Sequence, residues 1–371
     1  MEQDRMKISI VTVCFNSEAT IERAIQSVIA QKYEELEYIV IDGNSSDRTC
    51  EIIRKYEEDI SYWISEPDEG IYHAMNKGIA AATGQVIAFL NSDDWYNDNT
   101  LSKVRHYFEN NDVDLVSGNI YFYEEGEALV EDIPKQTAVE DYFFDIGLPH
   151  PALFARTALF PKYGSFDTQY KIAADYDWML RVCTGGARVL VVEDFFTYFS
   201  CGGMSTAGKY QAVKEQRRAA LAHMERTGRW DLQERLEAHY KERLHLARRN
   251  IYYIQNMDHV GSRLKALYPQ DGTFYIWGAG KRGRQCLELL DRADIPITGF
   301  VDSYTDSTTF MGHEIIRPER IAAKSYVFVT PQGHTESIRQ YLQEHGFAES
   351  QIIDFSDLID RLAASEETED D

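Results

Sequence analysis

The sequence has no long apolar run and no paired cysteine motif. No hydrophobic stretch approaches the roughly 18 residues that suggest a membrane span, and residues 1–5 lack the basic-then-apolar order of a secretion signal. The five cysteines are odd in number, scattered and never arranged as a CxxC pair, which argues against a disulfide framework or a cysteine zinc site. We therefore expect a cytoplasmic protein with free thiols.

Positive charge is also scarce. The chain has 38 Lys and Arg against 61 Asp and Glu, a formal net charge of -23. No broad basic face is left for a polyanion, so nucleic-acid binding is not expected. In contrast, 44% of the residues are hydrophobic and 12% aromatic, enough for sizeable cores. At about 150 residues per domain, the 371 residues predict two or three domains.

Residues 1–208 alternate short apolar runs with segments of helical spacing. The strand-like runs lie at 8–15, 37–41 and 85–90, and the helical segments lie at 21–29, from about 47 and at 100–108. This alternation is typical of a mostly parallel sheet covered by helices. We therefore predict a Rossmann-like α/β domain here.

Residues 209–271 are almost free of proline and glycine and predict a helical linker. The stretch from 209 to 267 has 13 Lys and Arg against 7 Asp and Glu. A solvated helical spacer is the interpretation we favour. The alternative is that four arginines hold the protein on an anionic membrane surface, at about 1 kcal/mol each. They are Arg217, Arg218, Arg248 and Arg249.

Residues 272–360 predict a second, small Rossmann-like unit. A strand precedes a turn containing Gly278, Gly280 and Gly283, a helix follows, and Asp302 ends the next strand. The unit has no evident second half, so NAD chemistry is not expected. Of the roles that this unit could have, we place protein contact or oligomerisation first, nucleotide-sugar binding second and catalysis third. Residues 361–371 form an acidic tail that we expect to be disordered.

Acidic residues follow two predicted strands of the first domain. Asp42 ends one run, and Asn91 to Asp94 follow another, so both groups should meet at the carboxyl edge of the sheet. Asp93 and Asp94 suit a hard divalent cation, Mg²⁺ or Mn²⁺, which would neutralise a diphosphate. The alternative is that residues 92–98 only cap the next helix.

Four stretches, 10–16, 42–49, 68–78 and 89–94, resemble family 2 glycosyltransferases of the GT-A fold in order and spacing. The resemblance implies inverting transfer of a sugar from a nucleotide donor. It assigns metal binding to Asp93 first and Asp94 second. Asn91 replaces the usual aspartate and is left to the donor site. The implied donor-site residues are Thr12, Val13, Asn16, Asp42, Asp68, Gly70, Asn76, Lys77, Asn91 and Ser92.

The same resemblance implies a catalytic base. The stretch 164–167 is followed by Ala174 and Asp175, and Ala174 stands where many relatives have Glu, so Asp175 is the candidate. It would deprotonate the acceptor hydroxyl. The alternative is a helix cap, with Trp178 in the core. We place His150 and Trp178 on the acceptor side, although a lone histidine is more often a packing residue, and residues 201–205 resemble the GG-x-S element that ends such domains.

The resulting prediction is an inverting glycosyltransferase that depends on Mn²⁺ or Mg²⁺ and uses a nucleotide sugar, a UDP-sugar first. The resemblance implies a glycan or lipid-linked glycan acceptor in bacterial surface polysaccharide biosynthesis, with peripheral membrane contact and a homo-oligomer as further expectations. One rival is a bifunctional enzyme whose second domain also binds or modifies a nucleotide sugar. The others are a non-catalytic scaffold and a glycoside hydrolase, which would need two carboxylates and no diphosphate-binding metal.

Overall fold

The computed structural model describes most of the chain. The described residues are 6–124, 127–129, 138–201, 208–255, 263–265, 267–268, 272–303, 305, 307–331 and 334–363. The predicted glycine element from 202 to 205, the tail from 364 and the side chains of Arg248 and Arg249 lie outside this description. The chain divides into two compact units, Met1–Leu244 and His245–Asp371.

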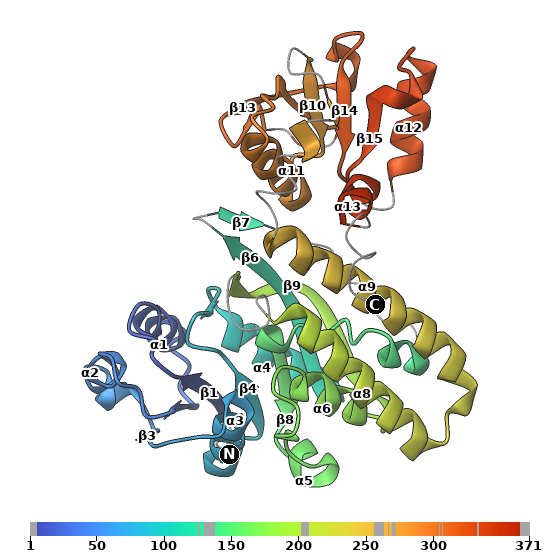
Figure 1. Ribbon diagram of the computed structural model, residues 1–371. Coiled ribbons are helices and arrows are strands. Elements are labelled where there is room, and N and C mark those ends of the chain that lie inside the picture. The colour runs from blue at the N-terminus through green and yellow to red at the C-terminus, as the bar shows by residue number, and fades with distance from the viewer. Residues whose placement is uncertain are drawn as a thin grey trace. The chain divides into compact units, whose positions relative to one another are not determined.

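The first unit is built on one large sheet with helices along it (Figure 1). Its strands are β1 (Ile8–Cys14), β2 (Leu36–Asp42), β3 (Tyr62–Ser65), β4 (Val86–Phe89), β5 (Trp95–Tyr96), β6 (Leu115–Glu124), β7 (Glu127–Leu129), β8 (Leu153–Arg156) and β9 (Val189–Ser200). Its helices are α1 (Ile21–Ile29), α2 (Thr49–Arg54), α3 (Ile71–Ala81), α4 (Thr100–Asn110), α5 (Leu159–Tyr163), α6 (Ala174–Thr184), α8 (Lys209–Thr227) and α9 (Gln233–Gln255), with α9 ending beyond the unit boundary.

The strand order is β3-β2-β1-β4-β8-β6-β9-β5, with β7 paired to β6. β1, β2, β3 and β4 are parallel, whereas β8 runs antiparallel to both of its neighbours. β1 and β2 are almost entirely buried, as their apolar, β-branched sequences require in the middle of a sheet. The parallel strands therefore present their carboxyl ends at one edge.

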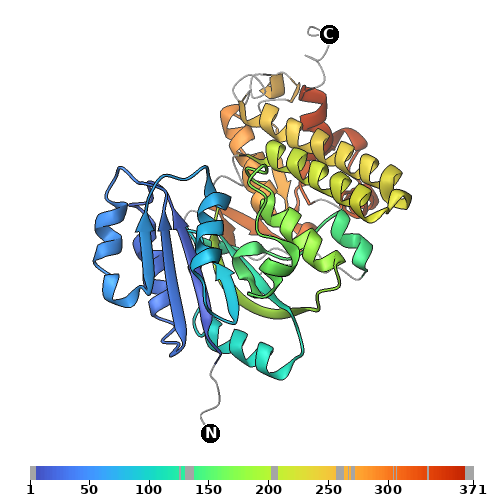
Figure 2. The same ribbon diagram turned by 90° about the horizontal axis from the view of Figure 1, so that it is seen from below.

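Helices cover both faces of this sheet (Figure 2). Ile10 belongs to the core that includes residues of α1 and α4, whereas Val11 on the opposite face meets α3. A Cβ atom on Gly78 of α3 would lie 2.3 Å from Val11 Cγ1, so only glycine permits this close approach. The approach fixes α3, and with it the loop that precedes the helix, against β1.

Residues 209–244 of the helical stretch are part of the first unit. α8 packs against α6 and buries Val213, Ala219 and Met224. The Tyr240 hydroxyl of α9 lies 2.9 Å from that of Tyr176 in α6. The stretch is helical, as predicted, but these contacts differ from the solvated spacer that we favoured. The apolar positions of α8 are too widely spread among charged residues to reveal a buried face from sequence alone.

The second unit has a sheet of order β12-β13-β11-β10-β14-β15, parallel except for the β12–β13 pair. Its strands are β10 (Phe274–Trp277), β11 (Gly299–Val301), β12 (Thr309–Phe310), β13 (His313–Ile316), β14 (Tyr326–Val329) and β15 (Ile352–Asp354). Its helices are α11 (Lys281–Arg292), α12 (Thr335–Glu344) and α13 (Phe355–Ala363). Separate cores on the two faces of the sheet confirm a second α/β unit.

Among the described helices, none is both long and apolar enough to cross a membrane.

Candidate functional site

A cavity of about 720 Å³ opens in the first unit where β1 and β4 end. It is lined by Val13, Cys14, Phe15, Asn16, Ser17, Ala19, Thr20, Asp68, Gly70, Ile71, Tyr72, Ala74, Met75, Asn91, Ser92, Asp93, His150, Pro151, Lys171, Ile172, Asp175 and Phe199. The lining brings together residues far apart in the chain, among them the predicted metal ligand Asp93 and the predicted base Asp175. This is the carboxyl edge of the sheet that the sequence indicated.

Asp42 is fully buried behind this edge and does not line the cavity. Its carboxylate accepts hydrogen bonds from the Ser45 amide at 2.9 Å, the Ser45 hydroxyl at 2.5 Å and the Ser65 hydroxyl at 2.5 Å. Burial opposes ionisation, but these hydrogen bonds hold the pKa of Asp42 below its usual value. Asp42 therefore shapes the loop after β2 as an ionised carboxylate.

The loops after β1 and β2 are tied together at the cavity mouth. The Asn16 amide donates to the Ser45 hydroxyl at 2.7 Å, and Asn16 Oδ1 accepts the Ser46 amide at 2.9 Å. Asn16 has a φ of 49°, a left-handed conformation that asparagine tolerates. The Ser17 and Ser92 hydroxyls lie 2.9 Å apart and connect the β1 loop to the acidic motif after β4. These bonds make the mouth a single connected frame.

The segment before α3 brings a second carboxylate to the cavity. Asp68 Oδ1 accepts the Gly70 amide at 2.8 Å, and Gly70 has a φ of 121°, which favours glycine. A Cβ atom on Gly43 would lie 2.6 Å from Asp68 Oδ2, so Gly43 lets this carboxylate approach the backbone closely. Lys171 lines the same cavity and its amine donates to the Glu69 carbonyl at 3.4 Å.

The acidic motif places one aspartate in the cavity and one behind it. Asp93 lines the cavity, whereas Asp94 is fully buried and its Oδ1 accepts the Ser200 amide at 2.9 Å. Burial raises the pKa of Asp93; burial together with the charge of Asp93 raises that of Asp94 well above its usual range. Arg23 donates to the Asp93 carbonyl at 3.0 Å, and its charge partly offsets the rise in the pKa of both aspartates.

These residues fit a divalent cation. Within the described part of the chain, Asn91 Oδ1 and Asp94 Oδ2 are buried oxygens without a hydrogen-bond partner. Two adjacent desolvated carboxylates repel each other, and a cation relieves that cost. No group of three or more His, Cys, Asp or Glu side chains suited to a metal occurs among the described residues, so a cation here needs ligands from a bound phosphate or water. Mg²⁺ and Mn²⁺ commonly bind in this way.

Asp175 lies in the first turn of α6 and its Oδ1 accepts the Tyr72 hydroxyl at 2.8 Å. Burial, reinforced by the Asp175 charge, raises the pKa of Tyr72 well above its usual range, so the phenol keeps its proton. His150 stacks on Phe89 with ring centroids 5.5 Å apart. Burial lowers the pKa of His150, although the Asp175 charge opposes the shift, and this favours the neutral imidazole.

Other predicted site residues pack away from the cavity. Asn76 makes two hydrogen bonds to the Phe166 backbone, at 2.9 and 3.0 Å, and holds the loop before α6. Lys77 pairs with Glu66 at 2.8 Å. Thr12 is fully buried and accepts the Tyr38 hydroxyl at 3.1 Å. Trp178 is 2% exposed and stacks on Phe160 at 4.5 Å, which matches the core alternative considered from sequence.

Several lining residues were not selected from the sequence, among them Phe15, Tyr72 and Lys171. Phe15 follows the buried strand β1 yet is 63% exposed, and an aromatic residue directly after such a strand could have signalled it. Tyr72 and Lys171 gave no comparable signal, because their place at the cavity depends on the packing of α3 and α6.

In the second unit, the glycine turn has the close packing that its sequence predicts. A Cβ atom on Gly283 would lie 2.0 Å from the Gly278 carbonyl oxygen, and Gly278 has a φ of 110°. Asp302 accepts the Ala279 amide at 3.1 Å and the Thr305 amide at 3.0 Å. Gly280 directly precedes α11, and a Cβ atom on Gly280 would meet no atom within 4 Å. The Asp302 carboxylate thus stabilises the turn itself.

Comparison with protein families places two matches on the chain. Residues 9–151 match the model for glycosyl transferase family 2, and residues 273–353 match the model named C2185-like, N-terminal. An uncharacterized glycosyltransferase of Mycobacterium tuberculosis is 33% identical over 180 residues, which cover 47% of this chain and 68% of the relative. A PGL/p-HBAD biosynthesis glycosyltransferase of Mycobacterium bovis is 28% identical over 190 residues, or 49% of this chain and 71% of that protein.

Solved structures show the same fold at low sequence identity. Residues 1–349 of S. aureus TarS in complex with UDP-GlcNAc give a TM-score of 0.52 at 18% identity, covering 78% of this chain and 90% of that one. The mannosyltransferase PcManGT of Pyrobaculum calidifontis, in complex with GDP-Man and Mn²⁺, gives 0.51 at 17% identity, covering 78% and 86%. The first unit thus has the GT-A fold, as predicted. The chain belongs to glycosyl transferase family 2.

Proposed function

We propose that the protein is an inverting, metal-dependent glycosyltransferase that moves a sugar from a nucleotide sugar to a glycan or lipid-linked glycan in surface polysaccharide biosynthesis. The observation that carries the proposal is that Asp93 and Asp175 line the same cavity. Each has a distinct task there. Asp93 suits a cation that would neutralise the diphosphate, and Asp175 suits proton removal. A uridine nucleotide is the first donor to test, since a structural relative is complexed with UDP-GlcNAc.

The donor would bind at the mouth formed by the β1 and β2 loops. Phe15 offers an exposed aromatic face for a nucleobase. Asn16, Asp68 and Ser92 add polar groups along the lining. A cation bound at Asp93 would neutralise the diphosphate and favour its departure. Lys171 is the cationic side chain of the described lining and would reinforce that neutralisation.

Asp175 would act as general base in a single displacement. Its carboxylate takes the proton of the acceptor hydroxyl as that oxygen bonds to the anomeric carbon of the sugar. The bond from the anomeric carbon to the diphosphate oxygen breaks, and its electron pair leaves with the nucleoside diphosphate. Tyr72 holds the carboxylate through the 2.8 Å hydrogen bond, and neutral His150 beside it can orient the acceptor. Such a base contributes about 10²- to 10⁴-fold in rate.

The proposal is tested by calorimetric titration of nucleoside diphosphates and nucleotide sugars, with and without Mn²⁺. We expect one site that needs metal and weakens at least about tenfold in Asp93→Asn, because the carboxylate is the charged protein ligand. Asp98→Asn, an exposed aspartate in the same segment, is the matched control and should bind normally.

Metal-independent binding, or equal binding by Asp93→Asn, would contradict the proposed metal site. A second stoichiometric site would favour the bifunctional alternative, in which the second unit also binds a nucleotide sugar. Failure of every nucleotide to bind would favour the scaffold.

Peripheral membrane contact and self-association remain predictions. Arg218 already donates to the Gln169 carbonyl at 2.9 Å and lies over the Tyr170 ring at 4.3 Å, so it has a structural task within the first unit.

A further inference from the structure

The wall that carries Asp175 is held from behind by a carboxylate of α8. Glu215 is only 5% exposed, and its Oε2 accepts three consecutive amides, those of Lys171 and Ile172 at 2.8 Å and of Ala173 at 3.2 Å. Ala173 is the N-cap residue of α6 and has no side-chain oxygen to offer as a cap. Glu215 thus supplies, from another helix, a shared acceptor for the three amides that lead into α6.

Burying this carboxylate would cost free energy without hydrogen bonds to compensate for the lost water. The three amides supply that compensation, and the positive end of the α6 dipole adds to it. Gln211, one turn earlier on α8, donates to Glu215 Oε1 at 3.0 Å and fixes the second oxygen. Glu215 therefore has a single well-determined position.

The segment that Glu215 holds belongs to the cavity. Lys171 and Ile172 line it, and Asp175 follows two residues after the last amide that Glu215 accepts. The Ile172 carbonyl lies 2.7 Å from the Tyr72 hydroxyl, the same group that donates to Asp175. Movement of this segment would consequently shift both the carboxylate and its hydrogen-bonding partner.

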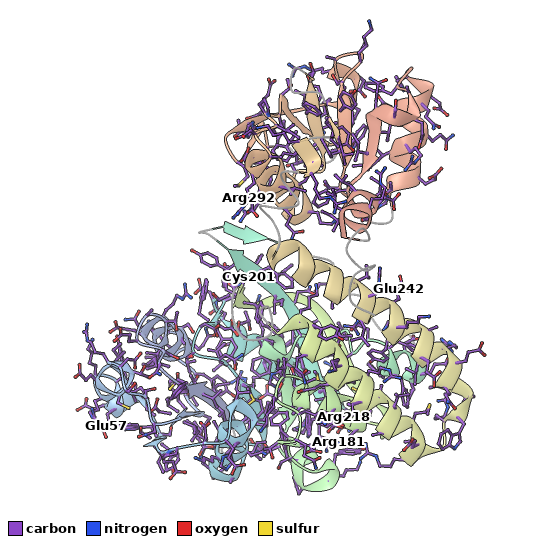
Figure 3. The ribbon with its side chains drawn as sticks, viewed as in Figure 1. Glu57, Arg181, Cys201, Arg218, Glu242 and Arg292 are labelled. Atoms are coloured by element: carbon purple, nitrogen blue, oxygen red, sulfur yellow. The ribbon has the colours of Figure 1, made fainter. Side chains whose placement is uncertain are left out.

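Two arginines brace the chain leading to this segment, both labelled in Figure 3. Arg181 of α6 donates to the Ser165 carbonyl at 2.9 Å, and Arg218 of α8 donates to the Gln169 carbonyl at 2.9 Å. They hold the earlier part of the loop. Glu215 and Arg218 both hold this loop from α8, and the backbone partners of Glu215 lie nearer to Asp175 along the chain.

We propose that Glu215 is a positioning residue for glycosyl transfer, which fixes the location of Asp175 by holding the amides of residues 171–173. The proposal rests on the proposed role of Asp175 as base. It makes α8, which the sequence presented as a linker, part of the catalytic apparatus. A displacement of about 1 Å in a reacting group can cost about 100-fold in rate.

The test is a double-mutant cycle on the full-length protein with Mn²⁺. We compare kcat, donor KM and thermal midpoint for Glu215→Ala and Glu215→Gln, alone and combined with Asp175→Asn. Glu215→Ala should lower kcat by about 100-fold with little change in donor KM, and should add almost nothing to the loss in Asp175→Asn. Glu215→Gln keeps an accepting oxygen and should lose much less. Glu225→Ala, at an exposed position of the same helix, is the matched control.

An equal loss from Glu215→Ala in both backgrounds would overturn the positioning role and indicate a general structural one. If Glu215→Ala fails to fold, Glu215→Gln carries the test through the same cycle, and an equal effect in both backgrounds would again overturn the role. Full activity of Asp175→Asn would overturn the assignment of the base itself, and with it the inference from Glu215.

Discussion

At the residue scale, buried carboxylates stabilise the first unit where their oxygens meet several donors. Glu37 of β2 is 8% exposed and accepts from Lys7 Nζ and Ser9 Oγ, both at 2.6 Å, and from the Thr83 amide at 2.7 Å. It thereby connects β1, β2 and the turn before β4. Burial opposes ionisation of Glu37, but these bonds lower its pKa to about 2.

We expect Glu37→Ala to lower the free energy of unfolding by about 2 kcal/mol, because it leaves the Ser9 hydroxyl and the Thr83 amide without their acceptor. The native pKa lies below the unfolded value, so the contribution of Glu37 is present above about pH 4.5 and is lost as pH falls toward 2. Urea denaturation at pH 7 measures the change. The exposed Glu35→Ala is the control, and an equally small effect in both would refute this role for Glu37.

The candidate site shows which residue roles a sequence can predict. Asp93 and Asp175 both line the cavity. Asp93 was expected at this edge from its place after a strand, whereas Asp175 was selected through the family resemblance. Asn76, Lys77 and Trp178 belong to the same motifs but pack elsewhere, since a motif does not say which way a side chain points. Glu215 could not be found, because its three amide partners lie more than 40 residues earlier in the chain.

At the scale of the element, α8 holds α6 at both ends. Glu215 meets the beginning of α6, and His223 meets its end, where Nε2 lies 2.6 Å from the Thr184 hydroxyl. The Arg226 guanidinium lies 2.7 Å from His223 Nδ1. Burial, followed by the charges of Arg226 and Arg181, lowers the pKa of His223 to about 4. The histidine is therefore neutral in the folded protein at neutral pH.

This contact predicts sensitivity to acid. Between about pH 6.5 and 4 the unfolded chain binds a proton at His223 that the native protein does not, so stability falls as pH falls through that window. We expect a loss on the order of 1–2 kcal/mol between pH 7 and 5, reduced by solvent near the helix end. Urea unfolding at the two pH values measures it. His223→Gln should show a smaller difference, and an unchanged difference would exclude His223 as the cause.

The element scale also explains why the helical stretch was interpreted as a spacer. Its composition correctly predicts helices, because it is rich in Ala, Leu, Glu and Arg. Its packing depends on a few buried positions such as Ala219 and Tyr240, scattered among charged residues. Composition predicts which segments form helices. It does not predict where a helix packs, because the surface of α6 that it covers exists only in the folded unit.

At the scale of the whole molecule, the sequence predicts both α/β units but not every strand direction within the first unit. Alternating strands and helices predicted both sheets, since parallel pairing follows from strands separated by helices. The antiparallel strands β8 and β5 were not anticipated, because antiparallel insertion leaves no mark in short runs such as Trp95–Tyr96.

The domain boundaries proposed from sequence have a direct test. A chain ending at residue 271 should keep donor binding and thermal stability close to those of the first unit in the full protein, because it retains α8 and α9. A chain ending at residue 208 should lose cooperative unfolding, since it exposes the α6 surface covered by Val213, Met224 and Tyr240. Calorimetric melting compares the two, and a stable, active chain of 208 residues would show that the helices are only a linker.

We expect the cavity at the ends of β1 and β4 to bind the donor nucleotide. A crystal structure of the full-length protein with Mn²⁺ and uridine diphosphate tests it most directly. We expect density for the base beside Phe15, the metal at Asp93 and the diphosphate within the cavity that Asp175 also lines. Nucleotide density only at the glycine turn of the second unit, with the cavity of the first unit empty, would contradict it.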